Sequence, residues 1–318
     1  MNRYYLAPLE GITTYIFRNA YHRYFYPMDK YFTPFLVPHS KKGFSAKEKR
    51  EILPENNEGL YLVPQIMSNH ADECLKTIEK LRVYGYKEVN LNMGCPSKTV
   101  VSKGRGAGFL AFPEELDYFL DEVFEGISNT DVKLSIKTRL GRDEPEEFFR
   151  ILEIYNQYPL EELIIHPRVQ KDFYKNMPNL EMFAYGAENS KSRVCYNGEI
   201  FSAEKYEEIE RSFPDVHTFM LGRGILERPD LLGQIRRRER KSEEGEEGFL
   251  DIEKLRRFHD RLYEDYRALG MGDKNVLFKM KEIWCYLGKS FPEKEKVLKK
   301  IRKAERLEKY EAAVEELL

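Results

Sequence analysis

The chain has 318 residues, 42% of them hydrophobic and 33% charged, which is the composition of an ordinary globular protein. Its net charge of −2 excludes a general attraction to nucleic acid, so RNA binding would need a local basic patch. The four cysteines are scattered and form no CxxC pair, which indicates a reducing compartment and no zinc site. No apolar run reaches the roughly 20 residues of a membrane span, and the N-terminus has no signal-peptide core. We therefore expect a cytoplasmic protein without a metal.

Short apolar runs alternate with helical patterns through the first two thirds of the chain. The runs predicted as strands are Tyr4–Ala7, Leu60–Ile66, Glu88–Met93, Lys133–Lys137, Leu163–His166, Arg193–Tyr196 and His217–Leu221. The predicted helices are Ala71–Tyr84, Pro113–Ile127, Glu144–Gln157 and Ser202–Ser212. This alternation predicts a parallel sheet with crossover helices. A TIM (β/α)8 barrel fits it better than a doubly wound sheet, because no GxGxxG follows the first strand.

The composition changes near Gln234. The charged segment 236–248 is typical of a linker, and Leu250–Leu318 has a helical pattern without strand signals. We predict a barrel domain over 1–238 and a small all-helical domain of three or four helices over 239–318. Between Asp273 and Lys309 there are 12 Lys/Arg and 6 Asp/Glu with interleaved aromatic residues. Such a segment suits RNA phosphates and bases, although a solvated helix face over an aromatic core gives the same pattern.

Nearly every predicted strand ends in a polar or glycine-containing segment. In a β/α barrel these carboxyl ends converge on one mouth, where catalytic residues lie. Seven such endings in succession predict a catalytic mouth. They contain Pro8-Leu9-Glu10-Gly11, Gln65, Asn90 and Asn92, Lys137 and Arg139, His166 and Arg168, Asn197-Gly198-Glu199, and Gly222-Arg223-Gly224.

Cys95 follows one of these strands between Gly94 and Pro96. Taken alone, such a cysteine is more often a small residue packed in a tight turn. An unperturbed thiol, with a pKa near about 8.5, is mostly protonated at neutral pH and can act as a general acid. A nucleophilic role would need a nearby base, and the sequence places no histidine within a few residues.

Four other strand endings suggest contacts to a cofactor or substrate. Gly222-Arg223-Gly224 can grip a phosphate through backbone N–H groups and a guanidinium, with Asn197-Gly198-Glu199 as the other half of the cradle. Two ordinary turns are the alternative. Lys137 at the mouth would need an anionic partner, or it points outward to solvent. His166 is either a hydrogen-bonding group for a cofactor or substrate or a satisfied structural residue.

Taken together, these segments resemble the tRNA-dihydrouridine synthases, flavin-dependent enzymes that reduce uridine in tRNA. The most specific match is Asn90-Leu91-Asn92-Met93-Gly94-Cys95-Pro96-Ser97-Lys98. The others, in the family's order, are Ala7-Pro8-Leu9-Glu10-Gly11, Pro64-Gln65, Ile136-Lys137-Thr138-Arg139, His166-Pro167-Arg168, Asn197-Gly198-Glu199 and Gly222-Arg223-Gly224. The chain departs from the family pattern at Leu9 and Thr14 and in the segment 167–183, which leaves the modified tRNA position open.

The resemblance implies an FMN-containing barrel followed by a tRNA-binding helical domain, with NADPH as the reductant. It implies that Cys95 donates a proton to carbon 5 of the uracil and that Asn92, Lys98 and Arg168 contact the substrate. The residues it implies around FMN are Pro8, Leu9, Glu10, Gln65, Lys137, His166, Asn197, Gly198, Glu199, Gly222 and Arg223. We expect a monomer without metal or membrane partner. An FMN-dependent reductase of free pyrimidines and an RNA-binding protein with a degenerate barrel are the alternatives.

Overall fold

The computed structural model describes residues 2–38, 43–240 and 250–318. The chain divides into two compact units. We call them the strand unit, with the residues up to Pro8, Asp29–Gly198 and Ser212–Met220, and the helical unit, with Leu9–Met28, Glu199–Arg211 and the chain from Leu221 onward. The domain boundary at residue 239 stays a prediction. Most of the predicted linker over 236–248 lies outside the described residues.

The strands of the described chain form one parallel sheet, ordered β3-β2-β1-β9-β8-β7-β6-β5-β4. They are β1 (Arg3–Leu6), β2 (Lys30–Phe32), β3 (Leu62–Val63), β4 (Gln65–Ile66), β5 (Glu88–Met93), β6 (Lys133–Gly141), β7 (Glu162–Val169), β8 (Val194–Tyr196) and β9 (Thr218–Leu221). The two edge strands, β3 and β4, are consecutive in sequence and are separated only by Pro64.

Pro64 interrupts this pair of strands because proline has no N–H to donate to a sheet. Its carbonyl oxygen still accepts a hydrogen bond from the Asn90 N–H at 2.9 Å. β3 pairs with β2 on one side, and β4 pairs with β5 on the other. The two pieces thus act as one strand that joins both edges of the sheet. Eight strands close in this way, and the predicted (β/α)8 barrel is confirmed.

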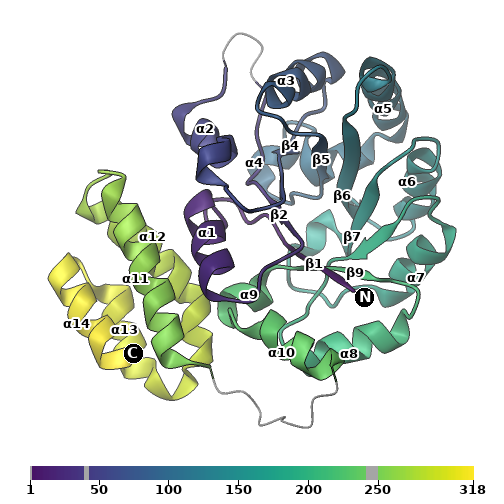
Figure 1. Ribbon diagram of the computed structural model, residues 1–318. Helices are drawn as coiled ribbons and strands as arrows, with labels where there is room; N and C mark the ends of the chain where they lie inside the picture. Colours follow the sequence, from purple (N-terminus) through teal and green to yellow (C-terminus); the bar gives the residue numbers. More distant parts are fainter. Residues whose placement is uncertain (1, 39–42, 241–249) are drawn as a thin grey trace. The chain divides into compact units, whose positions relative to one another are not determined.

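The helices of the strand unit lie outside its strands (Figure 1). The main ones are α3 (Ala71–Val83), α5 (Pro113–Ile127), α6 (Glu147–Tyr155) and α7 (Leu180–Asn189), with the shorter α2 (Ala46–Ile52) and α4 (Lys98–Val101) and three 3-10 turns. α5 shows why these segments are helical: Pro113 stands at its first position, and Leu116, Phe119, Leu120 and Val123 form one buried face. The predicted limits of α5 are confirmed.

The helical unit contains α1 (Tyr15–Tyr24), α8 (Ala203–Ser212), α9 (Arg223–Glu227), α10 (Leu231–Glu239), α11 (Ile252–Ala268), α12 (Asp273–Leu287), α13 (Glu295–Lys303) and α14 (Leu307–Leu317). The predicted helical tail is confirmed. The core of the helical unit includes a T-shaped contact of Phe17 with Phe258, at 5.6 Å between ring centroids. Among the described helices, none is long and apolar enough to cross a membrane.

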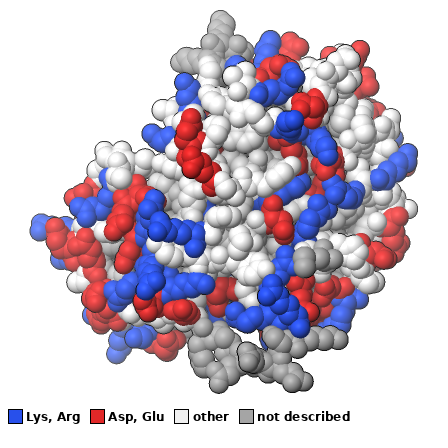
Figure 2. Space-filling model, viewed as in Figure 1, with Lys and Arg blue, Asp and Glu red and all other residues white. Residues whose placement is uncertain are grey.

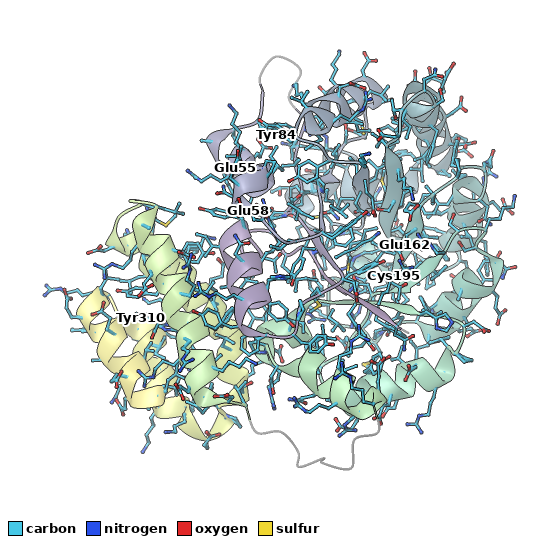
Figure 3. All side chains as sticks on the ribbon, in the orientation of Figure 1. Glu55, Glu58, Tyr84, Glu162, Cys195 and Tyr310 are labelled. Atoms are coloured by element: carbon cyan, nitrogen blue, oxygen red, sulfur yellow. The ribbon has the colours of Figure 1, made fainter. Side chains whose placement is uncertain are left out.

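A buried hydroxyl, that of Tyr310, links three elements of the helical tail (Figure 3). The indole Nε1 of Trp284 donates to the Tyr310 oxygen at 2.9 Å, and that oxygen lies 2.6 Å from Nε2 of His259. Because an indole N–H only donates, the Tyr310 hydroxyl accepts the hydrogen bond from Trp284. Burial raises the pKa of Tyr310 well above its usual range.

The barrel interior carries a buried cluster of charges at the amino ends of its strands. The Lys30 ammonium lies 2.8 Å from both carboxylate oxygens of Glu88 and 3.8 Å from Oε2 of Glu162. The hydroxyl of Tyr5 donates to the other oxygen of Glu162 at 3.1 Å. Burial raises the pKa of the Glu162 carboxyl (Figure 3).

Candidate active site

Polar side chains occur at every second position of two neighbouring strands, β5 and β6, and point to the same face of the sheet. In the β5–β6 register, Asn90 lies beside Ser135 and Asn92 beside Lys137. Residues two apart in a strand share a face, so these four side chains face one side. On β7, His166 lies beside Arg139 in the register, which continues the row on the same face. The predicted mouth residues of these three strands are therefore brought together.

The turn that carries Cys95 is held by Asn92. The Oδ1 atom of Asn92 accepts hydrogen bonds from the N–H of Gly94 at 3.1 Å and of Cys95 at 2.9 Å. Gly106 packs against the turn with φ of 55°, and a Cβ there would lie 2.9 Å from the Cys95 carbonyl oxygen. Cys95 itself is half-buried. The cysteine is thus a positioned group, fixed by polar contacts, rather than a buried packing residue.

Two further side chains tie this turn to the loop after β7. The buried guanidinium of Arg139 donates to the carbonyl oxygens of Gly94 at 3.0 Å, Val169 at 2.8 Å and Phe173 at 2.7 Å. Gln170 Nε2 donates to the carbonyl oxygen of Pro96 at 3.0 Å. Arg139 is among the predicted mouth residues but is not assigned to cofactor or substrate, and Gln170 is not among them. The signal for Arg139 was its spacing two residues beyond Lys137 in the same strand.

Lys137 is a mouth residue that carries a cation whose pKa is lowered by burial. Its side chain is half-buried, and no residue in the described ranges gives it a hydrogen bond or an ion pair. Burial, helped by the nearby Arg139 cation, lowers the pKa of Lys137 from 10.5 to about 8. An ammonium in this setting is stabilised by an electron-rich or anionic ligand. The donor set at the mouth therefore fits the polar edge of a flavin or a pyrimidine.

His166 and Arg168 lie together at the end of β7. The guanidinium Nη1 of Arg168 lies 3.1 Å from His166 Nε2, and its Nε donates to the Asn176 carbonyl oxygen at 2.6 Å. Because arginine only donates, His166 Nε2 accepts and its ring proton is on Nδ1. His166 is therefore a neutral imidazole with a donor at Nδ1. The ring of Tyr174 lies 6.1 Å from the imidazole, centroid to centroid.

The predicted cofactor residues divide between the two units. The strand unit contains Pro8, Gln65, Lys137, His166, Asn197 and Gly198, and the helical unit contains Leu9, Glu10, Glu199, Gly222 and Arg223. Within the strand unit, Asn197 Nδ2 donates to the Met220 carbonyl oxygen at 2.9 Å. Of the residues assigned to the substrate, Asn92 and Arg168 are buried, while Lys98 is exposed at the start of α4.

Within the helical unit, the segments around Glu199 and Arg223 meet. Arg223 Nη2 lies 3.1 Å from Glu199 Oε1, and the guanidinium lies 5.3 Å from the ring centroid of Phe201. A Cβ at Gly224 would lie 2.1 Å from the Ile200 carbonyl oxygen, so only glycine allows this backbone approach. The two predicted halves of the phosphate cradle are adjacent, and their carboxylate orients the arginine.

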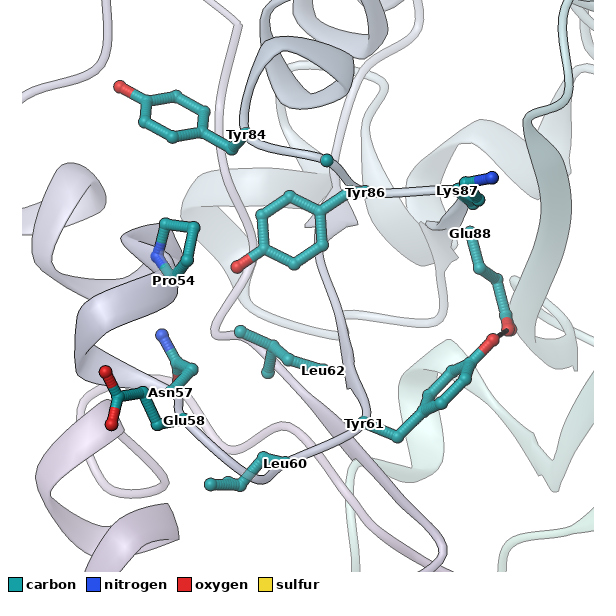
Figure 4. Close-up of a pocket in the computed structure, with 11 residues that line it drawn as sticks. Pro54, Asn57, Glu58, Leu60, Tyr61, Leu62, Tyr84, Tyr86, Lys87 and Glu88 are labelled. Carbon is teal, nitrogen blue, oxygen red and sulfur yellow. Dashed lines mark hydrogen bonds between the residues drawn. The ribbon is translucent and has the colours of Figure 1, made fainter.

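A separate cavity lies at the opposite, amino ends of β3 and β5 (Figure 4). Its volume is about 520 Å³, and its wall includes Tyr61, Tyr84, Tyr86, Glu58 and Glu88. The Tyr61 hydroxyl donates to Glu88 at 3.0 Å. This cavity contains none of the predicted site residues. No group of three metal-ligating side chains and no disulfide is present in the part of the chain that the structure describes.

In the structure, several basic residues of the C-terminal helices are paired with acidic ones, which the count of Lys and Arg in the sequence does not show. Lys300 pairs with Glu316 at 2.6 Å, and Arg302 pairs with Glu295. On the C-terminal helices, Figure 2 shows Lys and Arg interspersed with Asp and Glu. Lys296, Lys299 and Lys303 are exposed on α13 without an ion pair to any described residue. Their spacing of three and four places them on one helix face.

Solved structures with a similar fold include a reductase and an old yellow enzyme homologue. Morphinone reductase in complex with tetrahydroNAD matches with a TM-score of 0.52 at 10% identity, covering 74% of this chain and 86% of that chain. The old yellow enzyme homologue from Zymomonas mobilis matches with a TM-score of 0.52 at 12% identity, covering 80% and 92%. At these identities the likeness concerns the barrel fold alone.

Relatives found by sequence similarity point to one family of enzymes. The chain is 27% identical over 231 residues to tRNA-dihydrouridine synthase B of Pasteurella multocida, covering 72% of this chain and 68% of the relative. It is 27% identical over 233 residues to a probable tRNA-dihydrouridine synthase of Staphylococcus aureus, covering 70% and 68%. The family pattern of dihydrouridine synthases (Dus) matches residues 5–317. With this match over nearly its whole length, the chain belongs to the dihydrouridine synthase family.

Proposed function

We propose that this protein is a tRNA-dihydrouridine synthase that reduces the 5,6 double bond of a uridine in tRNA, with FMN bound in the barrel and NADPH as the reductant. The observation that carries the proposal is the turn of Cys95, whose backbone N–H is held by Asn92 beside the strand that carries Lys137. Family membership supports the reaction class. The names of the relatives support tRNA as the substrate.

Reduction of the double bond needs one hydride and one proton, delivered to adjacent carbons. Bound reduced FMN would supply the hydride to carbon 6 of the uracil. The Cys95 thiol gives its proton to carbon 5, and a half-buried thiol beside a polar mouth suits this role. Lys137 and the Nδ1–H of His166 offer positive charge and a hydrogen bond to electron-rich ring atoms. The target base must leave its stack to reach the barrel mouth.

The test of this function compares Cys95→Ala with the control variant Cys285→Ala, because Cys285 is exposed on α12. We expect the purified protein to be yellow and to form dihydrouridine on tRNA with NADPH. Cys95→Ala should keep its flavin and lose the product, while Cys285→Ala should keep both. Full activity of Cys95→Ala would remove Cys95 as the acid. Reduction of free uracil but not of tRNA would favour the free-pyrimidine reductase.

The exposed lysines of α13 support tRNA docking through the helical tail. Lys296, Lys299 and Lys303 share a face and lack acidic partners among the described residues. Replacing all three with alanine should weaken tRNA binding and reduce the slope of log K against log salt by about three. The matched control replaces Lys87, Lys133 and Lys191, exposed lysines of the strand unit. An equal loss in both triple variants would argue against a specific role of α13.

A further inference from the structure

An unbroken chain of side-chain hydrogen bonds runs through the barrel interior to the cysteine turn. Asn90 Nδ2 donates to Ser135 Oγ at 2.9 Å, and Gln65 Nε2 donates to Asn90 Oδ1 at 2.8 Å. Asn92 Nδ2 donates to Gln65 Oε1 at 2.8 Å. The chain ends where Asn92 Oδ1 accepts from the backbone N–H of Cys95. Three amide side chains thus connect β6 to the catalytic turn through β5 and β4.

The direction of this chain is fixed from its cysteine end. The backbone N–H groups of Gly94 and Cys95 can only donate, so Asn92 must turn its oxygen toward them. Its amino group then faces Gln65, which must present its oxygen, and the Gln65 amino group must meet the oxygen of Asn90. The hydroxyl of Ser135 both donates and accepts, so it can close the chain in either sense.

The amides in the middle of the chain are fully shielded from water. Gln65, Asn90 and Ser135 have an exposed fraction of 0%, and that of Asn92 is 8%. If one amide turned over, two amino groups or two oxygens would face each other without water to separate them. The orientation of each amide therefore depends on that of its neighbour. Asn90 is the amide farthest from Cys95 along this chain of hydrogen bonds.

We propose that Asn90 is a positioning residue of the reaction. It acts through Gln65 and Asn92 on the N–H groups of the cysteine turn, and so sets the place of the Cys95 thiol. This inference rests on the proposed function for the role of Cys95 as proton donor. The oxygen of Asn90 matters most, because it accepts the hydrogen bond from the buried amino group of Gln65, whose oxygen in turn accepts from Asn92.

Two substitutions separate polarity from size. Asn90→Leu keeps a similar volume and leaves the buried amino group of Gln65 without its acceptor, so that the Gln65 side chain must shift and disturb its hydrogen bond with Asn92. Asn90→Asp keeps an oxygen toward Gln65, and the Ser135 hydroxyl can turn to donate to the second oxygen. In the protein saturated with FMN and tRNA we expect Asn90→Leu to lower kcat about tenfold to hundredfold. Asn90→Asp should stay within about threefold of the unaltered protein.

A second measurement does not depend on catalysis. The rate of alkylation of Cys95 by iodoacetamide, read site by site by mass spectrometry, reports on thiol placement, with Cys285 as internal reference. Asn90→Leu should change the Cys95 rate at least about fivefold and leave Cys285 unchanged, and Asn90→Asp should change neither. Absence of dihydrouridine from the unaltered protein would refute the proposed function alone, because the alkylation result still tests the chain.

Two results would overturn the inference: Asn90→Leu with the kcat and Cys95 alkylation rate of the unaltered protein, or Asn90→Asp as defective as Asn90→Leu. The second would mean that the residue acts through its amide or its volume and not through the acceptor. If Asn90→Leu does not fold, Asn90→Ala removes the same acceptor oxygen without adding a bulky apolar side chain. The results expected for Asn90→Leu, and those that would overturn the inference, then apply to Asn90→Ala.

Discussion

Replacing Lys137 with methionine should stabilise the flavin-free protein while impairing the enzyme. Methionine keeps most of the length of the lysine side chain and removes the charge that no described residue compensates. Burial lowers the pKa of Lys137 from 10.5 to about 8. That difference corresponds to about 3.5 kcal/mol, at roughly 1.4 kcal/mol per pH unit. Because the side chain is only half-buried, partial solvation reduces the expected gain in unfolding free energy to about 2 kcal/mol.

The stability difference between the two proteins should depend on pH, because the pKa of Lys137 differs between the folded and the unfolded chain. The unfolded chain holds the Lys137 proton up to its ordinary pKa of 10.5, whereas the folded protein releases it near about 8. The cost of burying the charge is therefore complete below the folded pKa, and it disappears as the pH rises from there to the unfolded pKa. The stability difference between Lys137→Met and the unaltered protein should be largest at about pH 7 and small near about pH 10.5.

Urea unfolding of both flavin-free proteins, followed by circular dichroism across this pH range, measures the difference directly. With flavin and tRNA present, Lys137→Met should lose about a hundredfold in kcat, because the cation no longer faces the reacting rings. Equal stability of the two proteins at the lower pH would refute the reasoning, and so would a difference that stays constant as the pH rises.

The remaining predictions concern two other parts of the strand unit. Glu162→Gln should be as stable as the unaltered protein or more stable at neutral pH, because burial raises the pKa of Glu162 and its ionisation opposes folding. Glu88→Gln should lose about 3 kcal/mol by urea unfolding, since the buried lysine loses the negative charge of its partner and one of its two 2.8 Å contacts. Gly106→Ala should lower activity at unchanged flavin content, because its Cβ would lie 2.9 Å from the Cys95 carbonyl oxygen. The control Gly104→Ala also has positive φ, but its nearest atom belongs to a side chain at 3.5 Å, so a similar activity loss there would contradict the steric explanation.

The sequence predicts the barrel well because short apolar runs and amphipathic helices are local signals. The strand Glu88–Met93 and the helix Pro113–Ile127 have the predicted limits. Two features of the strands escaped prediction for physical reasons. β2 (Lys30–Phe32) has three residues and begins with a charge, so it gives no apolar run. Pro64 divides the run Leu60–Ile66 into two strands, each paired with a different neighbour.

The candidate site was predicted at its strand endings but not in its supporting contacts. Cys95, Lys137 and His166 follow apolar runs, and barrel topology brings such endings together. Ser135 gave no signal, since a serine inside a strand is common and its contact with Asn90 depends on the β5–β6 register. The cluster of Lys30 with two glutamates joins residues far apart in sequence. Such pairing arises from closure of the barrel, which local patterns do not describe.

The most direct test of the proposed reaction is nucleoside analysis of unmodified tRNA after incubation with the purified protein, FMN and NADPH. We predict that dihydrouridine appears, each product nucleoside gaining two hydrogens, and that Cys95→Ala retains flavin yet yields none. An unaltered protein that binds FMN and tRNA but leaves every uridine unreduced would contradict the account.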